Sequence, residues 1–109
     1  MKLINLFSNR SDKVEKRTSF TKAEASKIAK ELGIDFSKEK FTLNDFTAGL
    51  NVELEHGTRS LLTNVTNDNP IITGKIALAH LNEIPDYYVR LRKLESDAKA
   101  YWNKAFTNK

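Results

Sequence analysis

Apolar residues recur at helical spacing in four separate stretches of the chain. The first stretch opens at Thr21, which is followed three residues later by Glu24, the spacing of a capping box. Gly33, a residue typical of helix ends, closes it. We therefore predict a first helix between Thr21 and Gly33. The apolar positions between them, at a period near 3.6, are Ala25, Ile28, Ala29 and Leu32.

A second capping box pairs Thr42 with Asp45 and predicts a helix that ends at Gly57. Between the two predicted helices lies the connecting segment 34–41. The inward stripe of the second helix consists of Leu43, Phe46, Leu50 and Leu54. Residues 58–69 are rich in Thr, Asn and Asp, so we expect a loop there.

The two prolines of the chain mark the starts of two further helices. Asn69 can cap a third helix that has Pro70 at its first position. We expect Ile72, Ile76, Ala79 and Leu81 to face inward from it. Pro85 restarts the chain in a fourth helix. Its predicted apolar face is Tyr88, Leu91, Leu94, Ala98 and Tyr101, extended by Trp102 and Phe106.

Four helices joined by short loops predict a compact all-α bundle. With 109 residues the chain has the size of one domain, 1–109. Residues 1–20 are mostly polar, and we expect a loosely ordered N-terminal segment there. The first seven residues are the only candidate for a strand.

Charge is unevenly distributed along the chain. Residues 1–40 and 90–109 each have a net charge of +4, whereas residues 41–89 have a net charge of −4. The basic flanks suggest nucleic-acid binding, but their charges alternate in sign, as is usual for a solvated surface. There is no cysteine, so disulfides and thiolate metal sites are excluded. No signal peptide or membrane span is evident, and we expect a cytoplasmic protein that does not enter membranes.

Both histidines lie in the acidic middle, each three residues from a glutamate. Glu53 precedes His56, whereas His80 precedes Glu83. If the second and third helices pack antiparallel, this reversal lets all four side chains converge. Helical bundles hold metals with such Glu-x-x-His spacings, and imidazole with carboxylate suits zinc, iron or manganese. Such a metal could activate water for hydrolysis. Asp68 and Asp86 could add ligands or orient the histidines.

Each histidine also has a purely structural interpretation. His56 stands beside Gly57 and could complement the negative end of its helix. His80 could be a core histidine whose ring bonds a backbone carbonyl. Asp86, in the first turn of the fourth helix, is favoured there by the helix dipole in any case.

From Phe41 to Leu94 the chain resembles a small family of uncharacterised bacterial and phage proteins. The blocks that carry the resemblance are FTLNDF, NVELEHG, TNVTND, TGKIALAHLNE and PDYYVRL. The family usually has a second acidic residue after Asp68, where this chain has Asn69. The resemblance implies a bacterial or phage origin and no particular activity.

No nucleophile elbow, dinucleotide-binding glycine turn or Ser-His-Asp set can be assembled, which favours a function other than catalysis. The leading hypothesis is a small protein-interaction module, a phage or prophage accessory protein that binds a host or virion protein in the host cytoplasm or the virion. Its predicted contact surface is Glu55, Asp68, Asp86 and Tyr87. The first alternative is a divalent-metal-binding helical protein that could act as a hydrolase. The second is a nucleic-acid-binding protein that uses the basic flanks.

Overall fold

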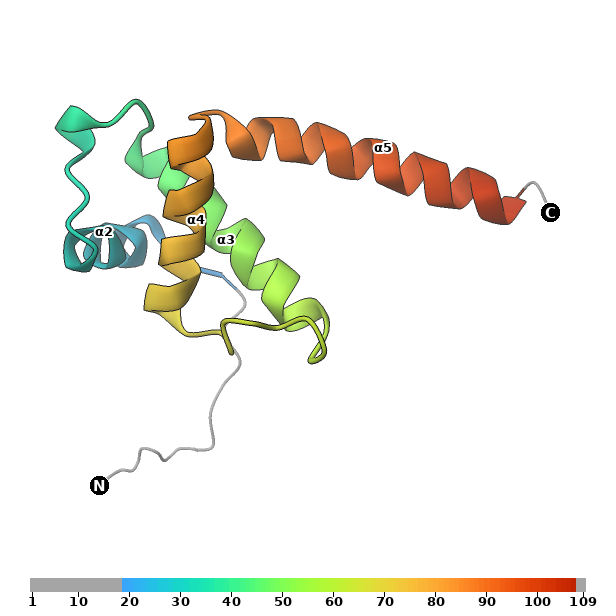
Figure 1. The fold of residues 1–109 in the computed structure, drawn as a ribbon, viewed down its shortest axis with the longest axis horizontal. Helices are drawn as coiled ribbons and strands as arrows, with labels where there is room; N and C mark the ends of the chain where they lie inside the picture. The colour runs from blue at the N-terminus through green and yellow to red at the C-terminus, as the bar shows by residue number, and fades with distance from the viewer. Residues whose placement is uncertain (1–18, 108–109) are drawn as a thin grey trace, which may run out of the picture.

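The computed structural model describes residues 19–107 and confirms the all-α fold class. Within that range the elements are four α-helices and one short 3-10 helix, with no strand (Figure 1). The predicted N-terminal strand lies outside the described residues. In chain order the elements are α2 (Lys22–Glu31), η1 (Phe36–Lys38), α3 (Leu43–Arg59), α4 (Pro70–Glu83) and α5 (Tyr87–Thr107).

The predicted helix starts are confirmed by side-chain to backbone hydrogen bonds. The Thr21 and Thr42 hydroxyls each accept a bond from a backbone N–H three residues on, and complete capping boxes form at both places. Asn69 Oδ1 accepts bonds from the N–H groups of Ile71 and Ile72, at 2.9 and 3.0 Å, with Pro70 following it. Helix α3 continues past Gly57, where it was expected to end, to Arg59.

Helix α3 lies at the centre of the fold and packs against α2, α4 and α5. Its predicted stripe is the core: Phe46, Leu50 and Leu54 are fully buried. Phe20 is also buried, and Asn51 of α3 bonds its backbone N–H and C=O. The chain is therefore fixed to α3 immediately before α2 begins.

The inward face of α4 differs from the prediction. Ile72 and Ala79 were expected to face inward but are exposed, whereas Leu81 is buried as expected. The helix instead turns small residues toward its neighbours, which lets them approach closely. A Cβ on Gly74 would lie only 2.8 Å from Ile28 Cγ2 of α2. The buried residues of α4 are Thr73, Gly74, Ala77 and Leu81.

Helix α5 packs on the bundle at its beginning and then extends away from it (Figure 1). Tyr88 is buried against α3, where a Cβ on Gly49 would lie 2.6 Å from Tyr88 Cε2. Further along, Leu94 and Tyr101 are 61% and 63% exposed. The predicted apolar face of the fourth helix is therefore covered at its first turns only, as far as the described residues show. None of the helices in residues 19–107 has both the length and the apolar composition needed to cross a membrane.

Candidate functional site

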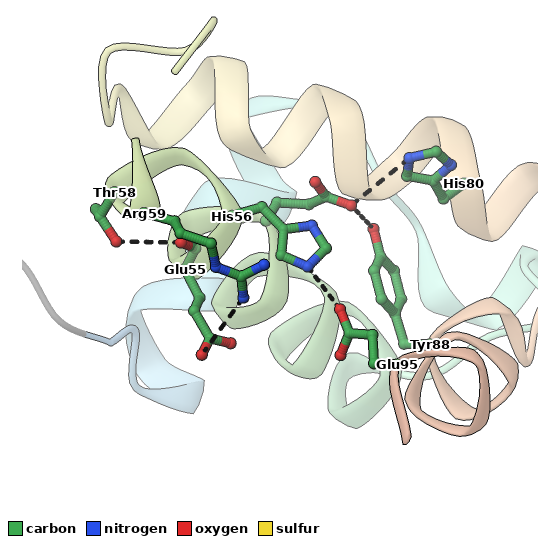
Figure 2. Close-up of polar contacts among 8 residues, drawn as sticks. Glu55, His56, Thr58, Arg59, His80, Tyr88 and Glu95 are labelled. Atoms are coloured by element: carbon green, nitrogen blue, oxygen red, sulfur yellow. Dashed lines mark hydrogen bonds and ion pairs between the residues drawn. The ribbon is translucent and has the colours of Figure 1, made fainter. Parts of the chain in front are cut away.

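Three helices meet at a cluster of two carboxylates, one histidine and two tyrosines, which we call the helix junction: Glu53, His80, Glu83, Tyr87 and Tyr88. Tyr88 of α5 donates its hydroxyl hydrogen bond to Glu53 Oε2 of α3 at 2.7 Å (Figure 2). The same Glu53 oxygen lies 3.6 Å from His80 Nε2 of α4. His80 Nδ1 faces Glu83 Oε1 at 3.7 Å. Three of the four predicted metal ligands are therefore neighbours.

Aromatic rings hold the His80 imidazole on its remaining sides. It stacks on Tyr87 with the ring centroids 4.1 Å apart and the planes at 12°. It also meets Tyr88 edge to face at 6.1 Å, and the two tyrosine rings meet in the same way at 4.9 Å. The imidazole is therefore part of the contact between α4 and α5, and it does not point into an open cavity.

The environment of the junction raises the pKa of both tyrosines. Burial raises the pKa of Tyr88 far above its usual value, and the hydrogen bond and charge of Glu53 raise it further. Burial, followed by the charges of Glu53 and Glu83, also raises the pKa of Tyr87. Tyr88 therefore serves as a hydrogen-bond donor that satisfies the carboxylate of Glu53, which is only 11% exposed.

His56 does not join the junction, although it shares α3 with Glu53. Its Nε2 lies 2.7 Å from Glu95 Oε2 of α5, and Figure 2 shows the two side chains directed toward each other. This contact joins α5 to α3 about two helical turns beyond Tyr88 of the junction. Glu95 was missing from the sequence-based candidates. Its spacing of seven residues from Tyr88, about two helical turns, places both side chains on one side of α5 and was the available signal.

The four predicted metal ligands thus divide into two groups. Glu53, His80 and Glu83 lie at the junction, whereas His56 is directed to Glu95. Across the residues that the structure describes, no group of three or more histidine, aspartate or glutamate side chains is placed to hold a metal ion. The predicted convergence of the two histidines does not form because α5 docks beside them. Helix α5 brings Tyr87 to His80 and Glu95 to His56, whereas the sequence suggested that the two histidines face each other.

The loop between α3 and α4, residues 60–69, is held by its own side chains. Asn64 donates from Nδ2 to Asp68 Oδ1 at 2.9 Å and accepts at Oδ1 from the N–H of Asn67 at 2.9 Å. The buried Thr66 hydroxyl accepts from the N–H of Asp68 at 3.0 Å. Asn67 and Asp68 have φ values of 53° and 62°, a left-handed conformation that Asn and Asp tolerate better than most residues. The loop therefore has a defined conformation.

This same loop exposes three aliphatic side chains. Leu61 is 94% exposed, Leu62 93% and Val65 82%. Leu61 and Leu62 are more exposed than the large apolar residues Leu94 and Tyr101 of α5, which are 61% and 63% exposed. Sequence analysis passed over them because they fall outside every helical period. Two adjacent leucines in a segment of Thr, Asn and Asp were the signal that could have identified them.

The predicted interaction residues fall at opposite ends of α4. Asp68 belongs to the loop before α4, and Glu55, which pairs with Arg59 at 3.9 Å, lies in the last turns of α3. Asp86 and Tyr87 follow α4, whose 14 residues span about 21 Å. Asp86 bonds Arg90 at 2.8 Å, and Tyr87 is stacked on His80. The four residues therefore form two sites, of which the loop end has the exposed apolar side chains.

Ion pairs within α5 occupy part of its basic surface. Arg90 bonds Asp86 at 2.8 Å and Lys93 bonds Asp97 at 3.0 Å. Half of the other basic flank, residues 1–18, lies outside the described residues. Nucleic-acid binding by the two flanks stays a prediction.

Comparison with known proteins identifies a family for this chain. No curated protein and no solved structure matches this chain. A family model described as "Protein of unknown function (DUF5661)" matches residues 25–97. The match begins before Phe41, at residue 25, so it takes in most of α2 as well as the segment whose sequence blocks indicated an uncharacterised family. Because it covers well over half of the sequence, the chain belongs to the DUF5661 family.

Proposed function

We propose that this protein is a non-enzymatic protein-interaction module and that the 60–69 loop is its contact surface. One observation carries the proposal: Leu61, Leu62 and Val65 are 94%, 93% and 82% exposed in a loop whose conformation is held by hydrogen bonds. Exposed aliphatic side chains gain free energy when a partner covers them. Because the loop is already ordered, little conformational entropy is lost on binding.

The surroundings of the loop suggest the chemistry of the partner. Glu55, one turn before the loop, has a side chain that is 70% exposed, and Asp68 lies within the loop. These carboxylates would be matched by a protein with an apolar pocket and basic residues at its rim, since complementary charges at an interface favour the correct partner. Asp86 and Tyr87, at the other end of α4, are not part of this surface.

Protein capture with matched variants tests the proposal. The bait is the full chain, and the test variant is Leu61→Glu/Leu62→Glu, which removes the two most exposed of the three aliphatic side chains without changing a side chain that makes the hydrogen bonds of the loop. The matched control is Val89→Glu on α5, where the wild-type side chain is 63% exposed. The predicted phage or prophage origin gives two classes of partner, host and virion proteins, and a lysate of phage-infected cells contains both.

We expect at least one protein to be captured by the wild-type chain and by Val89→Glu but lost with Leu61→Glu/Leu62→Glu. Titration of that purified protein should then give an affinity at least about tenfold weaker for the double variant, or about 1.4 kcal/mol of binding free energy. Identical captured sets from all three baits would contradict the proposal, provided that circular dichroism shows equal helix content.

A further inference from the structure

The distal part of α5 has exposed apolar side chains and no neighbouring helix among the described residues. Tyr87, Tyr88 and Leu91 pack against the bundle core, but Leu94 and Tyr101 are 61% and 63% exposed. Figure 1 shows this part of α5 extending away from the other helices. This surface is separate from the 60–69 loop, so the inference below does not depend on the proposed function.

The apolar positions of α5 follow a heptad repeat. Tyr87, Leu91, Leu94, Ala98 and Tyr101 are separated by steps of four, three, four and three residues. We call this set the α5 seam. A repeat of 3.5 residues keeps the apolar side chains on one line of the helix, the pattern that packs against a second helix in a coiled coil.

A groove continues the seam onto the bundle. It has a volume of about 490 Å³ and is open to solvent. Three seam residues, Tyr87, Leu91 and Leu94, line it on α5 together with Arg90, and Glu83 and Ile84 line it at the end of α4. The covered area of a second helix would therefore extend past the start of α5.

The charges beside the seam select the orientation. Arg90 and Asp97 are seven residues apart and so lie on the same edge of the seam. When two antiparallel copies place Leu91 opposite Leu94, Arg90 of each copy faces Asp97 of the other. A parallel pair would instead bring Arg90 to Glu95 of the second copy and leave Asp97 beside Trp102, with no charge to pair with it.

We propose that this chain forms an antiparallel homodimer through the α5 seam. In this register Tyr101 of the second copy reaches Ile84 and enters the groove. The two-fold symmetry makes the interface self-complementary, so each Arg90–Asp97 contact occurs twice. Arg90 and Asp97 keep their exposed intrahelical partners, Asp86 and Lys93, and the dimer joins these pairs into one row of alternating charges.

Sedimentation of the full chain tests the oligomeric state. We expect a mass of twice 12.4 kDa at micromolar concentration. Leu94→Glu should yield the monomer, whereas Ser96→Glu, on the opposite side of α5 from the seam, should leave the dimer intact. Leu61→Glu/Leu62→Glu should also remain dimeric, which separates this result from a failure of the loop proposal. A wild-type chain that is monomeric at roughly 100 µM would overturn the dimer.

Charge exchange tests the orientation. Arg90→Glu alone places two acids together, and Asp97→Arg alone places two bases together, so each should weaken self-association at least about tenfold. An equal mixture of the two variants restores both contacts and should form heterodimers with near wild-type affinity. Because the chain has no cysteine, Ala98→Cys supplies a single thiol. Efficient disulfide formation between two copies of Ala98→Cys would overturn the antiparallel arrangement.

Discussion

The two ends of α5 belong to one helix and are stabilised in different ways. At the first turns Tyr88 is 6% exposed, bonds Glu53 and packs on Gly49. Near the other end Tyr101 is 63% exposed and its ring contacts Trp102 of the same helix. The same residue type is a core residue in one place and a surface residue in the other.

This difference shows how much of the helix depends on the bundle. Isolated helices shorter than about 12–15 residues are marginal in water, because propensity alone barely offsets the cost of ordering the backbone. The distal part of α5, from Leu94 to Thr107, falls in this range. The Lys93–Asp97 ion pair is exposed, and it stabilises such a helix by at most about 0.5 kcal/mol. We therefore expect hydrogen exchange in the monomer to be slow near Tyr88 and fast near Tyr101.

The strongest way to break the comparison is to truncate the two tyrosines. Tyr88→Ala removes a buried ring and leaves Glu53 without its donor, so it should lower the free energy of unfolding by about 3–5 kcal/mol. Tyr101→Ala should change it by no more than about 0.5 kcal/mol in the monomer. Urea denaturation followed by far-UV circular dichroism at low protein concentration measures both. Equal losses would show that the distal half is part of the core.

A smaller effect comes from adding one methyl group at the contact between α3 and α5. The Cβ of Gly49→Ala would lie 2.6 Å from Tyr88 Cε2, so the ring must move. We expect a loss of about 1–3 kcal/mol from this overpacking, although alanine is the better helix former by about 1 kcal/mol. Ser96→Ala on exposed α5 is the control and should stabilise the protein slightly. A gain in stability with Gly49→Ala would contradict the close packing.

Alkaline titration sharpens the comparison further. Burial raises the pKa of Tyr88 in the folded protein, whereas in the unfolded chain a tyrosine loses its proton at about pH 10. Above that pH the folded state binds one proton more, so the free energy of unfolding should fall by about 1.4 kcal/mol per pH unit. Tyr88→Phe has no proton to lose. The difference in slope between the wild type and Tyr88→Phe isolates this contribution, and its absence would contradict the burial of the hydroxyl.

The smallest expected effect belongs to the contact between His56 and Glu95. Both side chains are partly exposed, at 32% and 45%, so solvent screens the interaction. A double-mutant cycle with His56→Ala and Glu95→Ala should give a coupling free energy of at most about 1 kcal/mol, reduced at high salt. A larger coupling that salt leaves unchanged would place this pair in the core.

Sequence analysis succeeded where the interactions are local. The helix starts at Thr21, Thr42 and Asn69 depend on side chains that bond backbone groups two or three residues away, so a short sequence pattern contains all the participants. The stripe of α3 was also predictable, because Phe46, Leu50 and Leu54 are large apolar residues that recur on one face of the helix at a period near 3.6.

The failures share a different cause. On α4 most of the buried positions are small residues such as Gly74. They are buried because α2 approaches closely there, and hydrophobicity in the sequence does not identify them. The neighbours of His56 and His80 depend on where α5 docks. This docking brings together residues that are far apart in the sequence: Tyr88 is 35 positions from Glu53, and Glu95 is 39 positions from His56. A pattern within one helix shows which residues share a face of that helix, but it does not show which residues of another helix they contact.

The position of Trp102 determines what fluorescence can report about this protein. It is the only tryptophan of the chain, and it is 58% exposed on distal α5. Its emission therefore reports the surroundings of that end of the helix and changes little when the core around Phe46 is lost. If the whole chain unfolds in a single cooperative step, tryptophan emission and circular dichroism should give the same melting midpoint, with only a small amplitude in the fluorescence. A fluorescence midpoint that differs from the circular dichroism midpoint would show that distal α5 melts separately from the bundle.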